Sequence, residues 1–279
     1  MLHLHHSNKL ENLMHSLLDV METQQGSVLK PTQILVQNPG MKRWLQQQIS
    51  SAQGIAANLE FPLPSRFIWD IFQTQFSDIE IQSNYDSEVL RWRIESVLGA
   101  NLDDAGLVAL KPYLEANEKG LGRFQLAEKL ASLFDQYLVY RPGMMSEWEH
   151  NKTYESVSET WQAALWRMLR DQSNQPHRAE LIKRLVSQIK SEQLNTERLP
   201  GYIYVFAISA LSPLYKNVLS ELSAFIDVHF LLLNPCQHYW GDIQSKKQQS
   251  KKIPNELIIE NNLLASLGQQ GKDFIDAFY

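Results

Sequence analysis

Strand-like patterns occur near both ends of this 279-residue sequence but not in its middle. Short apolar runs with the length and composition of buried strands cover residues 2–4, 33–37, 54–61, 202–208 and 225–233. Between residues 80 and 198, apolar residues recur instead at helical spacing. We therefore predict an α/β domain with a parallel sheet, interrupted by an all-helical insertion of roughly a hundred residues, which is the size of a small domain.

Helical signals between the runs support a parallel sheet, because a helix must carry the chain back before the next parallel strand begins. For example, Asn38 and Pro39 are suited to the cap and the first residue of the helix that follows the second run. We expect the first part of the α/β domain at residues 1–79, the insertion at residues 80–198 and the rest of the α/β domain at residues 199–279. The last helical pattern runs to the end without a stop signal, so we expect a natural chain that is longer.

Composition excludes several classes of protein. The single cysteine, Cys236, excludes an internal disulfide and a metal site made of several cysteines. The longest apolar run, near residues 230–233, is far too short to cross a bilayer, and the N-terminus lacks a secretion pattern. The net charge of -5 argues against nucleic-acid binding over the whole surface but allows a local basic groove. We expect a cytoplasmic protein without membrane contact.

The first strand, loop and helix stand where a nucleotide-binding α/β domain usually keeps its phosphate loop. Such a loop needs glycines so that successive backbone N–H groups surround the phosphates. Here the loop reads His6, Ser7, Asn8 and Lys9, with a lysine but no glycine. The acidic residue that would hold Mg²⁺ is also missing, because the run at residues 202–208 ends in phenylalanine, alanine and isoleucine. We predict no catalytic residue and no nucleotide cofactor.

Three histidines at the N-terminus allow two interpretations. His3 and His5 share one face of the expected strand, and His6 follows, which resembles part of a metal-ligand set. No cysteine or carboxylate lies at a useful spacing, so partly buried polar packing is the favoured interpretation. The acidic residues also lack the clustering that a metal-dependent nuclease needs, and we predict no bound metal.

Polar residues gather at the carboxyl end of the second strand, where open α/β sheets usually bind ligands. Gln37, Asn38 and Arg43 can hydrogen-bond base edges, and Trp44 offers a stacking surface. The alternative is a solvated helix start with Trp44 in the core. The sequence therefore allows, but does not require, a contact with DNA here.

Two further segments combine aromatic and charged side chains, namely Leu63, Arg66 and Trp69 in one and Asp135, Tyr137 and Arg141 in the other. This combination suits single-stranded nucleic acid, because each stacked base contributes about 1–3 kcal/mol. Core packing explains the aromatic residues equally well. Four lysines, Lys246, Lys247, Lys251 and Lys252, form a basic cluster in a polar loop that we expect to be solvated.

Several stretches taken together resemble one family: HSNKLENL, ILVQNPGMKRWL, GIAANLEFPLPSRFIWDIF, LFDQYLVYRP, LLLNPCQHYWGDI and NLLASLGQQGKDF. They are similar to the N-terminal quarter of the RecC family, the gamma subunits of exodeoxyribonuclease V. The resemblance implies a degenerate, helicase-like domain of the P-loop NTPase type with a helical insertion. It also implies a subunit without ATP hydrolysis or DNA cleavage of its own, which channels single-stranded DNA to RecB-like and RecD-like helicase-nuclease partners.

The family also reads the Chi sequence in the outgoing strand during double-strand break repair. The positions that match its Chi-reading surface are Gln37, Pro39, Arg43, Leu63, Trp69, Ser132, Leu133, Asp135 and Arg178. Pro39, Arg43 and Ser132 depart from the best-known members, which carry threonine, glutamine and aspartate. Because Pro39 has no side-chain donor and Arg43 favours an acceptor-rich edge such as that of guanine, the octamer read here is expected to differ.

Two other functions are compatible with the sequence. One is a residual nucleotide-binding or hydrolysing enzyme, which micromolar Mg²⁺-dependent ATP binding would reveal. The other is a structural scaffold for RecB and RecD that makes no DNA contact of its own.

Overall fold

A computed structural model describes residues 1–24, 30–115, 121–152, 156–236, 240 and 262–278. The chain divides into two compact units, one made of residues 1–71 and 195–279 and the other of residues 72–194. We call the first the sheet unit and the second the helical unit. No helix among the described residues is long and apolar enough to cross a membrane.

The sheet unit is built on a five-stranded parallel sheet with the strand order β1-β5-β4-β2-β3. Its strands are β1 (Leu2–Ser7), β2 (Thr32–Leu35), β3 (Leu59–Glu60), β4 (Tyr202–Phe206) and β5 (Asp227–Leu233). Two strands from the end of the chain thus lie between strands from its beginning. The predicted α/β class and parallel sheet are confirmed.

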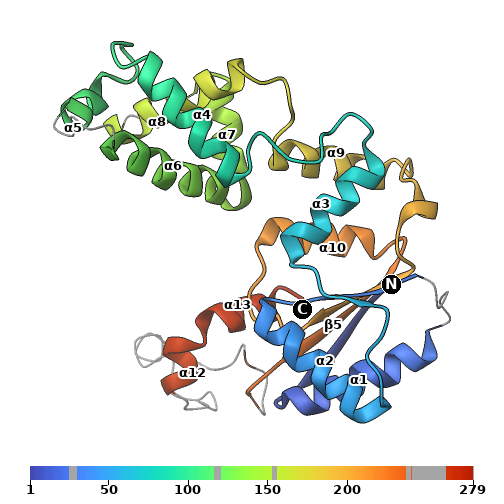
Figure 1. The fold of residues 1–279 in the computed structure, drawn as a ribbon. Coiled ribbons are helices and arrows are strands. Elements are labelled where there is room, and N and C mark those ends of the chain that lie inside the picture. The colour runs from blue at the N-terminus through green and yellow to red at the C-terminus, as the bar shows by residue number, and fades with distance from the viewer. Residues whose placement is uncertain (25–29, 116–120, 153–155, 237–239, 241–261, 279) are drawn as a thin grey trace, which may run out of the picture. The chain divides into compact units, whose positions relative to one another are not determined.

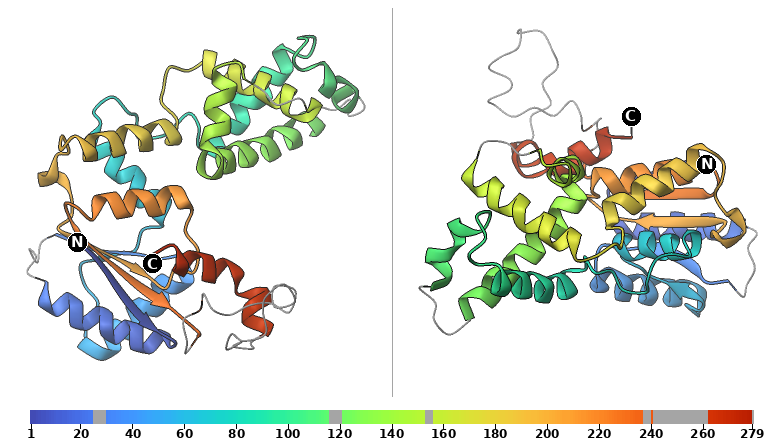
Figure 2. Two further views of the ribbon diagram at one scale, coloured as in Figure 1. Left: turned by 180° about the vertical axis from the view of Figure 1, so that it is seen from behind. Right: turned by 90° about the horizontal axis from the view of Figure 1, so that it is seen from above.

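Helices cover both faces of this sheet (Figures 1 and 2). The helices of the sheet unit are α1 (Leu10–Thr23), α2 (Pro39–Gln53), most of α3 (Pro64–Gln75), α10 (Pro213–Leu222), α12 (Asn262–Leu267) and α13 (Gln269–Asp276), with a 3-10 turn at Thr196–Arg198. Helices α1 and α2 pack against one face through a core that includes Leu17, Ile34 and Phe206, while α10 lies on the other. The predicted cap of α2 is confirmed, because the Asn38 side chain accepts from the Met41 amide at 2.9 Å and Pro39 follows it.

Two strands, β3 and β5, begin later than the apolar runs that predicted them. In the run at residues 54–61, Gly54 and Asn58 have φ values of 80° and 55°, so extended backbone begins only after Asn58. In the run at residues 225–233, Phe225 instead donates its amide to the Leu222 carbonyl at 2.9 Å. A left-handed residue and a helix end therefore override the local apolar pattern.

In the described part of the helical unit, every regular element is a helix. Its members are α4 (Ser87–Ala100), a 3-10 turn (Val108–Leu110), α5 (Lys111–Glu115), α6 (Leu121–Tyr140), α7 (Pro142–Glu149), α8 (Val157–Asp171) and α9 (Arg178–Lys190). Aromatic rings fill the core: Phe134 and Trp166 meet edge to face with centroids 5.5 Å apart, and Tyr85 lies 5.4 Å from Trp166. Phe134 and Trp166 are completely buried, so these contacts hold α6 and α8 together.

Three histidines form a stack on the face of the sheet that α1 covers. His229 is almost completely buried, and its ring lies 4.4 Å from that of His3 and 5.5 Å from that of His5. The Gln24 amide Nε2 lies 3.3 Å from His229 Nε2, and His229 Nδ1 lies 3.3 Å from His5 Nε2. Because an amide N–H can only donate, Nε2 of His229 accepts and its Nδ1 carries the proton donated to His5. These contacts favour the interpretation of His3 and His5 as partly buried polar packing around a neutral His229.

This packing disfavours a positive charge on His229. Burial, together with the neighbouring His3 and His5, lowers the pKa of His229 to about 4, while Asp227 acts in the opposite direction. Burial also lowers the pKa of His5. An unfolded histidine titrates near pH 6.5. As the pH falls from about 6.5 toward 4, His229 becomes protonated in the unfolded chain but stays neutral in the folded chain. The free energy of unfolding therefore falls.

We predict that His229→Gln flattens the acid dependence of stability. We expect this residue to lower the free energy of unfolding of the wild-type sheet unit by up to about 3 kcal/mol between pH 6.5 and pH 4. The variant is less stable near neutral pH but has a shallower slope, measured by urea unfolding at several pH values. His15→Gln is the matched control, because His15 is exposed on α1, and its slope should equal that of the wild type. Equal slopes for His229→Gln and the wild type would contradict the buried neutral histidine.

Candidate nucleic-acid interface

All five strands point the same way, so their carboxyl ends share one edge of the sheet. In open α/β sheets this edge is where ligands bind, near the first turns of the helices that follow the strands. Helix α1 begins after β1, α2 after β2 and α10 after β4. This carboxyl edge is the natural place to examine both the expected nucleotide site and the expected DNA surface.

The turn between β1 and α1 does not form a phosphate cradle. Only Asn8 and Lys9 separate the strand from the helix, and the Lys9 amide donates to the Ser7 hydroxyl at 3.2 Å. A cradle needs successive N–H groups directed to one point, usually through alternating right-handed and left-handed residues. No residue from Met1 to Gln24 has a positive φ. The backbone therefore lacks the conformation that a glycine-rich loop supplies.

The end of β4 is apolar where a motor protein would carry its metal-binding carboxylate. Phe206 and Ile208 are buried, and Ala207 between them is 9% exposed. Ala207 has a φ of 48°, which is rare for a residue with a side chain, and its amide donates to the Leu231 carbonyl at 2.8 Å. The chain thus turns sharply here without presenting an acidic group.

Four of the sequence-predicted site residues lie exposed at the carboxyl edge. Gln37 is the second residue after β2, Pro39 is the first residue of α2, and Arg43 lies one turn further along that helix. Leu63, which is 43% exposed, precedes α3. The Val36 amide donates to the Pro62 carbonyl at 3.1 Å, and this bond brings the segments of Gln37 and Leu63 side by side. We call Gln37, Pro39, Arg43 and Leu63 the edge cluster.

The two tryptophans of this region are packed into the protein. Trp69, on α3, is only 8% exposed, so its ring offers little surface for stacking a base. Trp44 is half-buried and lies 6.2 Å from the Phe206 ring. For Trp44, the structure favours the core alternative over the stacking interpretation.

The remaining predicted site residues lie in the helical unit. On α6, Ser132 is exposed, Leu133 packs against the core and Asp135 is half-buried. The Arg178 guanidinium, on the first residue of α9, donates from Nη1 to Asp135 Oδ1 at 3.1 Å. Its Nη2 lies 3.7 Å from Asp86 Oδ1, which precedes α4. Burial raises the pKa of Asp86, while the charge of Arg178 opposes that rise.

The nine predicted site residues therefore form two groups. The edge cluster and Trp69 belong to the sheet unit, whereas Ser132, Leu133, Asp135 and Arg178 belong to the helical unit. Within each unit, the structure brings residues together that are distant in sequence. The four lysines at positions 246, 247, 251 and 252 lie outside the described residues.

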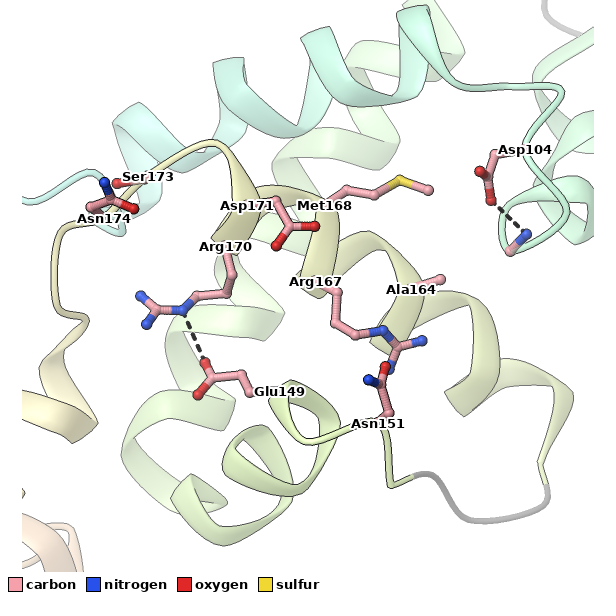
Figure 3. A pocket seen from close by; sticks show the side chains of 11 residues that line it. Asp104, Glu149, Asn151, Ala164, Arg167, Met168, Arg170, Asp171, Ser173 and Asn174 are labelled. Atoms are coloured by element: carbon pink, nitrogen blue, oxygen red, sulfur yellow. Dashed lines mark hydrogen bonds and ion pairs between the residues drawn. The ribbon is translucent and has the colours of Figure 1, made fainter.

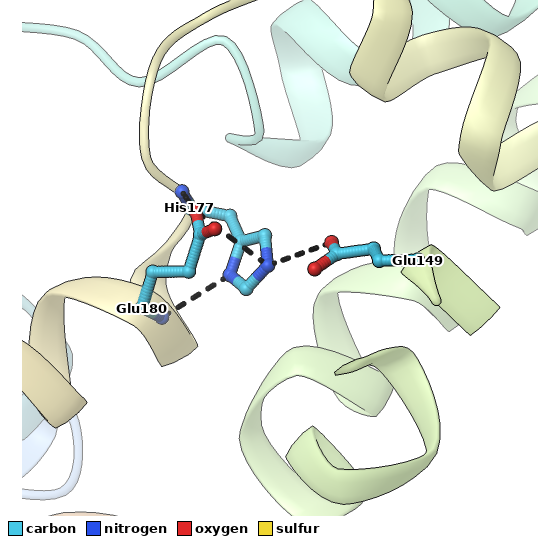
Figure 4. Close-up of side chains that lie close together, drawn as sticks. All are labelled: Glu149, His177 and Glu180. Atoms are coloured by element: carbon cyan, nitrogen blue, oxygen red, sulfur yellow. Dashed lines mark hydrogen bonds and ion pairs between the residues drawn. The ribbon is translucent and has the colours of Figure 1, made fainter. Parts of the chain in front are cut away.

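A buried polar network at the start of α9 was not predicted from the sequence. His177, which is 3% exposed, lies between Glu149 at the end of α7 and Glu180 on α9 (Figure 4). His177 Nε2 is 3.0 Å from Glu149 Oε1 and 3.7 Å from Glu180 Oε2. The separation of three residues between His177 and Glu180 was a possible signal, because a capping box has this spacing, although histidine is an unusual cap.

These three side chains are the group in the described part of the chain whose spacing would suit a metal ion. The Arg170 guanidinium, however, already contacts both carboxylates, from Nε to Glu149 Oε1 at 3.2 Å and from Nη2 to Glu180 Oε1 at 2.8 Å. A divalent cation between the carboxylates would meet this positive charge at close range. The arginine therefore supplies the balancing charge, and the donor set fits a structural network better than a metal site.

A polar cavity of about 780 Å³ borders this network (Figure 3). Arg167 and Arg170 face it together with Asp104, Glu149 and Asp171. The Arg167 guanidinium donates to the Trp148 carbonyl at 3.0 Å, and Arg170 pairs with Glu149. The cations of the cavity wall are thus engaged by the protein, so the cavity offers no concentrated charge to a ligand.

Comparison with known proteins places this architecture in a family. The family model described as RecC, N-terminal domain, matches residues 2–278. The chain is 34% identical to the RecBCD enzyme subunit RecC of Escherichia coli strain K12, with 99% of the chain and 28% of the relative covered. It is 29% identical to the subunit of the same name from Haemophilus influenzae, with 87% of the chain and 27% of the relative covered.

A more distant relative of the same name, from Mycolicibacterium smegmatis, is 24% identical over 96% of the chain and 24% of the relative. The chain therefore spans about a quarter of the length of the curated relatives that it matches. The family model matches nearly every residue of a chain that folds into a parallel sheet and a helical unit. The chain therefore belongs to the RecC family and corresponds to its N-terminal domain.

Proposed function

We propose that this chain is a non-catalytic, helicase-like region of a RecC-type subunit that binds single-stranded DNA and contributes to Chi recognition in recombinational repair. It functions with RecB-like and RecD-like partners, which hydrolyse ATP and cleave DNA, and it resides in the cytoplasm. Family membership supports the type of subunit. The observation that carries the DNA-binding role is the edge cluster, because four exposed predicted contacts converge at the carboxyl edge of the sheet.

The chemistry of the edge cluster suits a single strand. Gln37 can donate and accept on a base edge, and the Arg43 guanidinium can contact a phosphate or the acceptor edge of guanine. Leu63 adds an exposed apolar surface beside them. Pro39 opens α2 without an N–H donor, so readout at that position depends on shape and apolar contact. This set favours sequence reading over indiscriminate phosphate binding.

The backbone at the β1–α1 turn and the end of β4 favours loss of motor activity over the alternative of a residual ATPase. A two-residue turn without a left-handed residue cannot surround a triphosphate. The apolar end of β4 offers no carboxylate for Mg²⁺. The first turn of α1 alone would attract an anion by about 0.3–1 kcal/mol, which is far below what ATP binding requires.

We predict that Gln37→Ala and Arg43→Ala each weaken the binding of a labelled single-stranded oligonucleotide by about five- to twentyfold, the loss of one base or phosphate contact. Fluorescence anisotropy of the assembled RecC-type complex measures this effect. Gln53→Ala is the matched control, because Gln53 is exposed at the opposite end of the same helix. If both site variants bind as the control does, the chain acts as a scaffold.

Arg43 should also influence which sequence is preferred. Selection from a random oligonucleotide pool is expected to enrich guanine at one position with the wild-type chain and to lose that enrichment with Arg43→Gln. Arg43→Lys keeps the charge but not the two-pronged geometry and should lose most of the enrichment while retaining affinity. If all three proteins select the same oligonucleotide sequences, Arg43 contacts only a phosphate or does not contact DNA.

For the nucleotide alternative, we predict that calorimetric titration of the chain with ATP and Mg²⁺ detects no binding of micromolar affinity, because the β1–α1 turn forms no phosphate cradle. Lys9→Ala serves as the comparison, since Lys9 is the cation of the loop. Binding that requires Mg²⁺ and disappears in Lys9→Ala would overturn the non-catalytic assignment.

A further inference from the structure

We propose that His177 and Glu149 are positioning residues that seat Arg178 for its contact with DNA. The inference rests on the proposed function, in which Arg178 is one of the residues that meet the strand. Neither His177 nor Glu149 is expected to touch DNA. Their role follows from the way in which they fix the first turn of α9.

The start of α9 is closed by a reciprocal cap. The Glu180 amide donates to His177 Nδ1 at 3.3 Å, and the His177 amide donates to the Glu180 carboxylate at 2.9 Å. Both bonds enclose Arg178, which is the residue directly after His177. The backbone of Arg178 is therefore held on both sides by bonds that involve its neighbours.

The cap is in turn attached to the rest of the helical unit through the other ring nitrogen. Because Nδ1 accepts from an amide, Nε2 carries the proton and donates to Glu149 Oε1 at 3.0 Å. Glu149 also accepts from the Trp166 indole N–H at 3.0 Å. Burial raises the pKa of Glu149, but the hydrogen bonds that its carboxylate accepts from His177 and Trp166, together with the charge of Arg170, outweigh this effect and lower the pKa. Glu149 thus joins the ends of α7, α8 and α9.

Arg170 completes this attachment from the end of α8. Besides its two carboxylate contacts, it donates to the Tyr85 hydroxyl and to the Gln175 carbonyl, both at 2.9 Å. The position of His177 is fixed as well, because the residue is 3% exposed and each of its ring nitrogens has a partner. A buried histidine that lost one partner would be destabilised in its present position.

The consequence for Arg178 is a defined direction for its guanidinium. Its side chain is 18% exposed and reaches Asp135 on α6 and Asp86 before α4. A guanidinium has five N–H donors, so pairing with these carboxylates leaves donors for a base or a phosphate. Held in one orientation, it meets DNA without the loss of side-chain entropy that a freely rotating arginine would incur. If the His177–Glu149 bond breaks, the first turn of α9 is free to shift, and this orientation is lost.

The experiment uses one variant that cuts the bond and one that weakens it by removing the charge of the acceptor, and both preserve the cap. His177→Asn keeps an oxygen that can accept from the Glu180 amide, as asparagine does at many helix starts, but it is too short to reach Glu149. Glu149→Gln keeps the shape of its side chain and removes the charge. Val97→Ala is the control for stability, because Val97 is completely buried on α4 outside the network.

Two measurements are made on the 279-residue chain. The first is the ¹⁵N NMR signal of the Arg178 Nε–Hε group, assigned by its absence in Arg178→Ala. The second is the affinity for a labelled single-stranded oligonucleotide. We expect His177→Asn and Glu149→Gln to shift and broaden the arginine signal and to weaken binding by about three- to tenfold, while Val97→Ala lowers Tm and leaves both unchanged.

A double-mutant cycle separates positioning from general stability. In the Arg178→Ala background, His177→Asn should cause no further loss of affinity, because it acts only through Arg178. If Arg178→Ala weakens binding but His177→Asn does not, or if the two losses add, the positioning role is overturned and the proposed function stands. If Arg178→Ala binds as the wild type does, the DNA contact of Arg178 fails and the positioning role fails with it. Stabilisation of the wild type by Zn²⁺ that His177→Asn abolishes would assign the network to a metal and overturn the inference.

Discussion

The structure of the sheet unit depends on hydrogen-bonded pairing between segments from opposite ends of the chain. Leu2 of β1 pairs with Val228 of β5, and Ile34 of β2 pairs with Tyr204 of β4. These pairings require the chain to leave the sheet after β3 and to return for β4, so the helical unit must be an excursion from the sheet. Parallel strands also align their carboxyl ends, which is why Gln37, the β1–α1 turn and the end of β4 share one edge. The candidate interface is a product of this pairing.

The residues at this same edge differ from those of a nucleotide-binding site. A parallel sheet with helices after its strands is the arrangement in which phosphate loops and metal-binding acids usually occur, and here both positions hold other chemistry. The β1–α1 turn is short and conformationally ordinary, while Ala207 makes a sharp apolar turn after β4. Side chains that can read bases lie nearby, after β2 and before α3. The edge where parallel α/β sheets usually bind ligands therefore carries other side chains here than a phosphate loop and a metal-binding acid.

In the helical unit, two partly buried charges and one buried histidine determine how the helix ends meet. The aromatic core around Phe134 and Trp166 supplies most of the apolar burial, but rings alone do not define the register of one helix end against another. Glu149, Arg170 and His177 do so through directional bonds between α7, α8 and α9. Buried charges of this kind are costly unless each is paired, and here each has several partners. The network therefore contributes mainly to specificity of arrangement.

The sequence alone determined the elements that depend on local rules. Apolar runs and helical periods predicted the α/β class, the helical middle segment and the Asn38–Pro39 cap, because neighbouring residues decide these features. The spacing of Phe67, Ile68, Ile71 and Phe72 around Trp69 also contained a signal for the burial of that tryptophan. Only the tertiary structure decided which distant groups meet: His3 with His229, Val36 with Pro62, Arg178 with Asp135 and His177 with Glu149. The reason is physical. Hydrogen bonds, ring contacts and the burial that lowers the pKa of His229 all depend on which atoms are close in space. The spacing of residues along the sequence does not specify those distances.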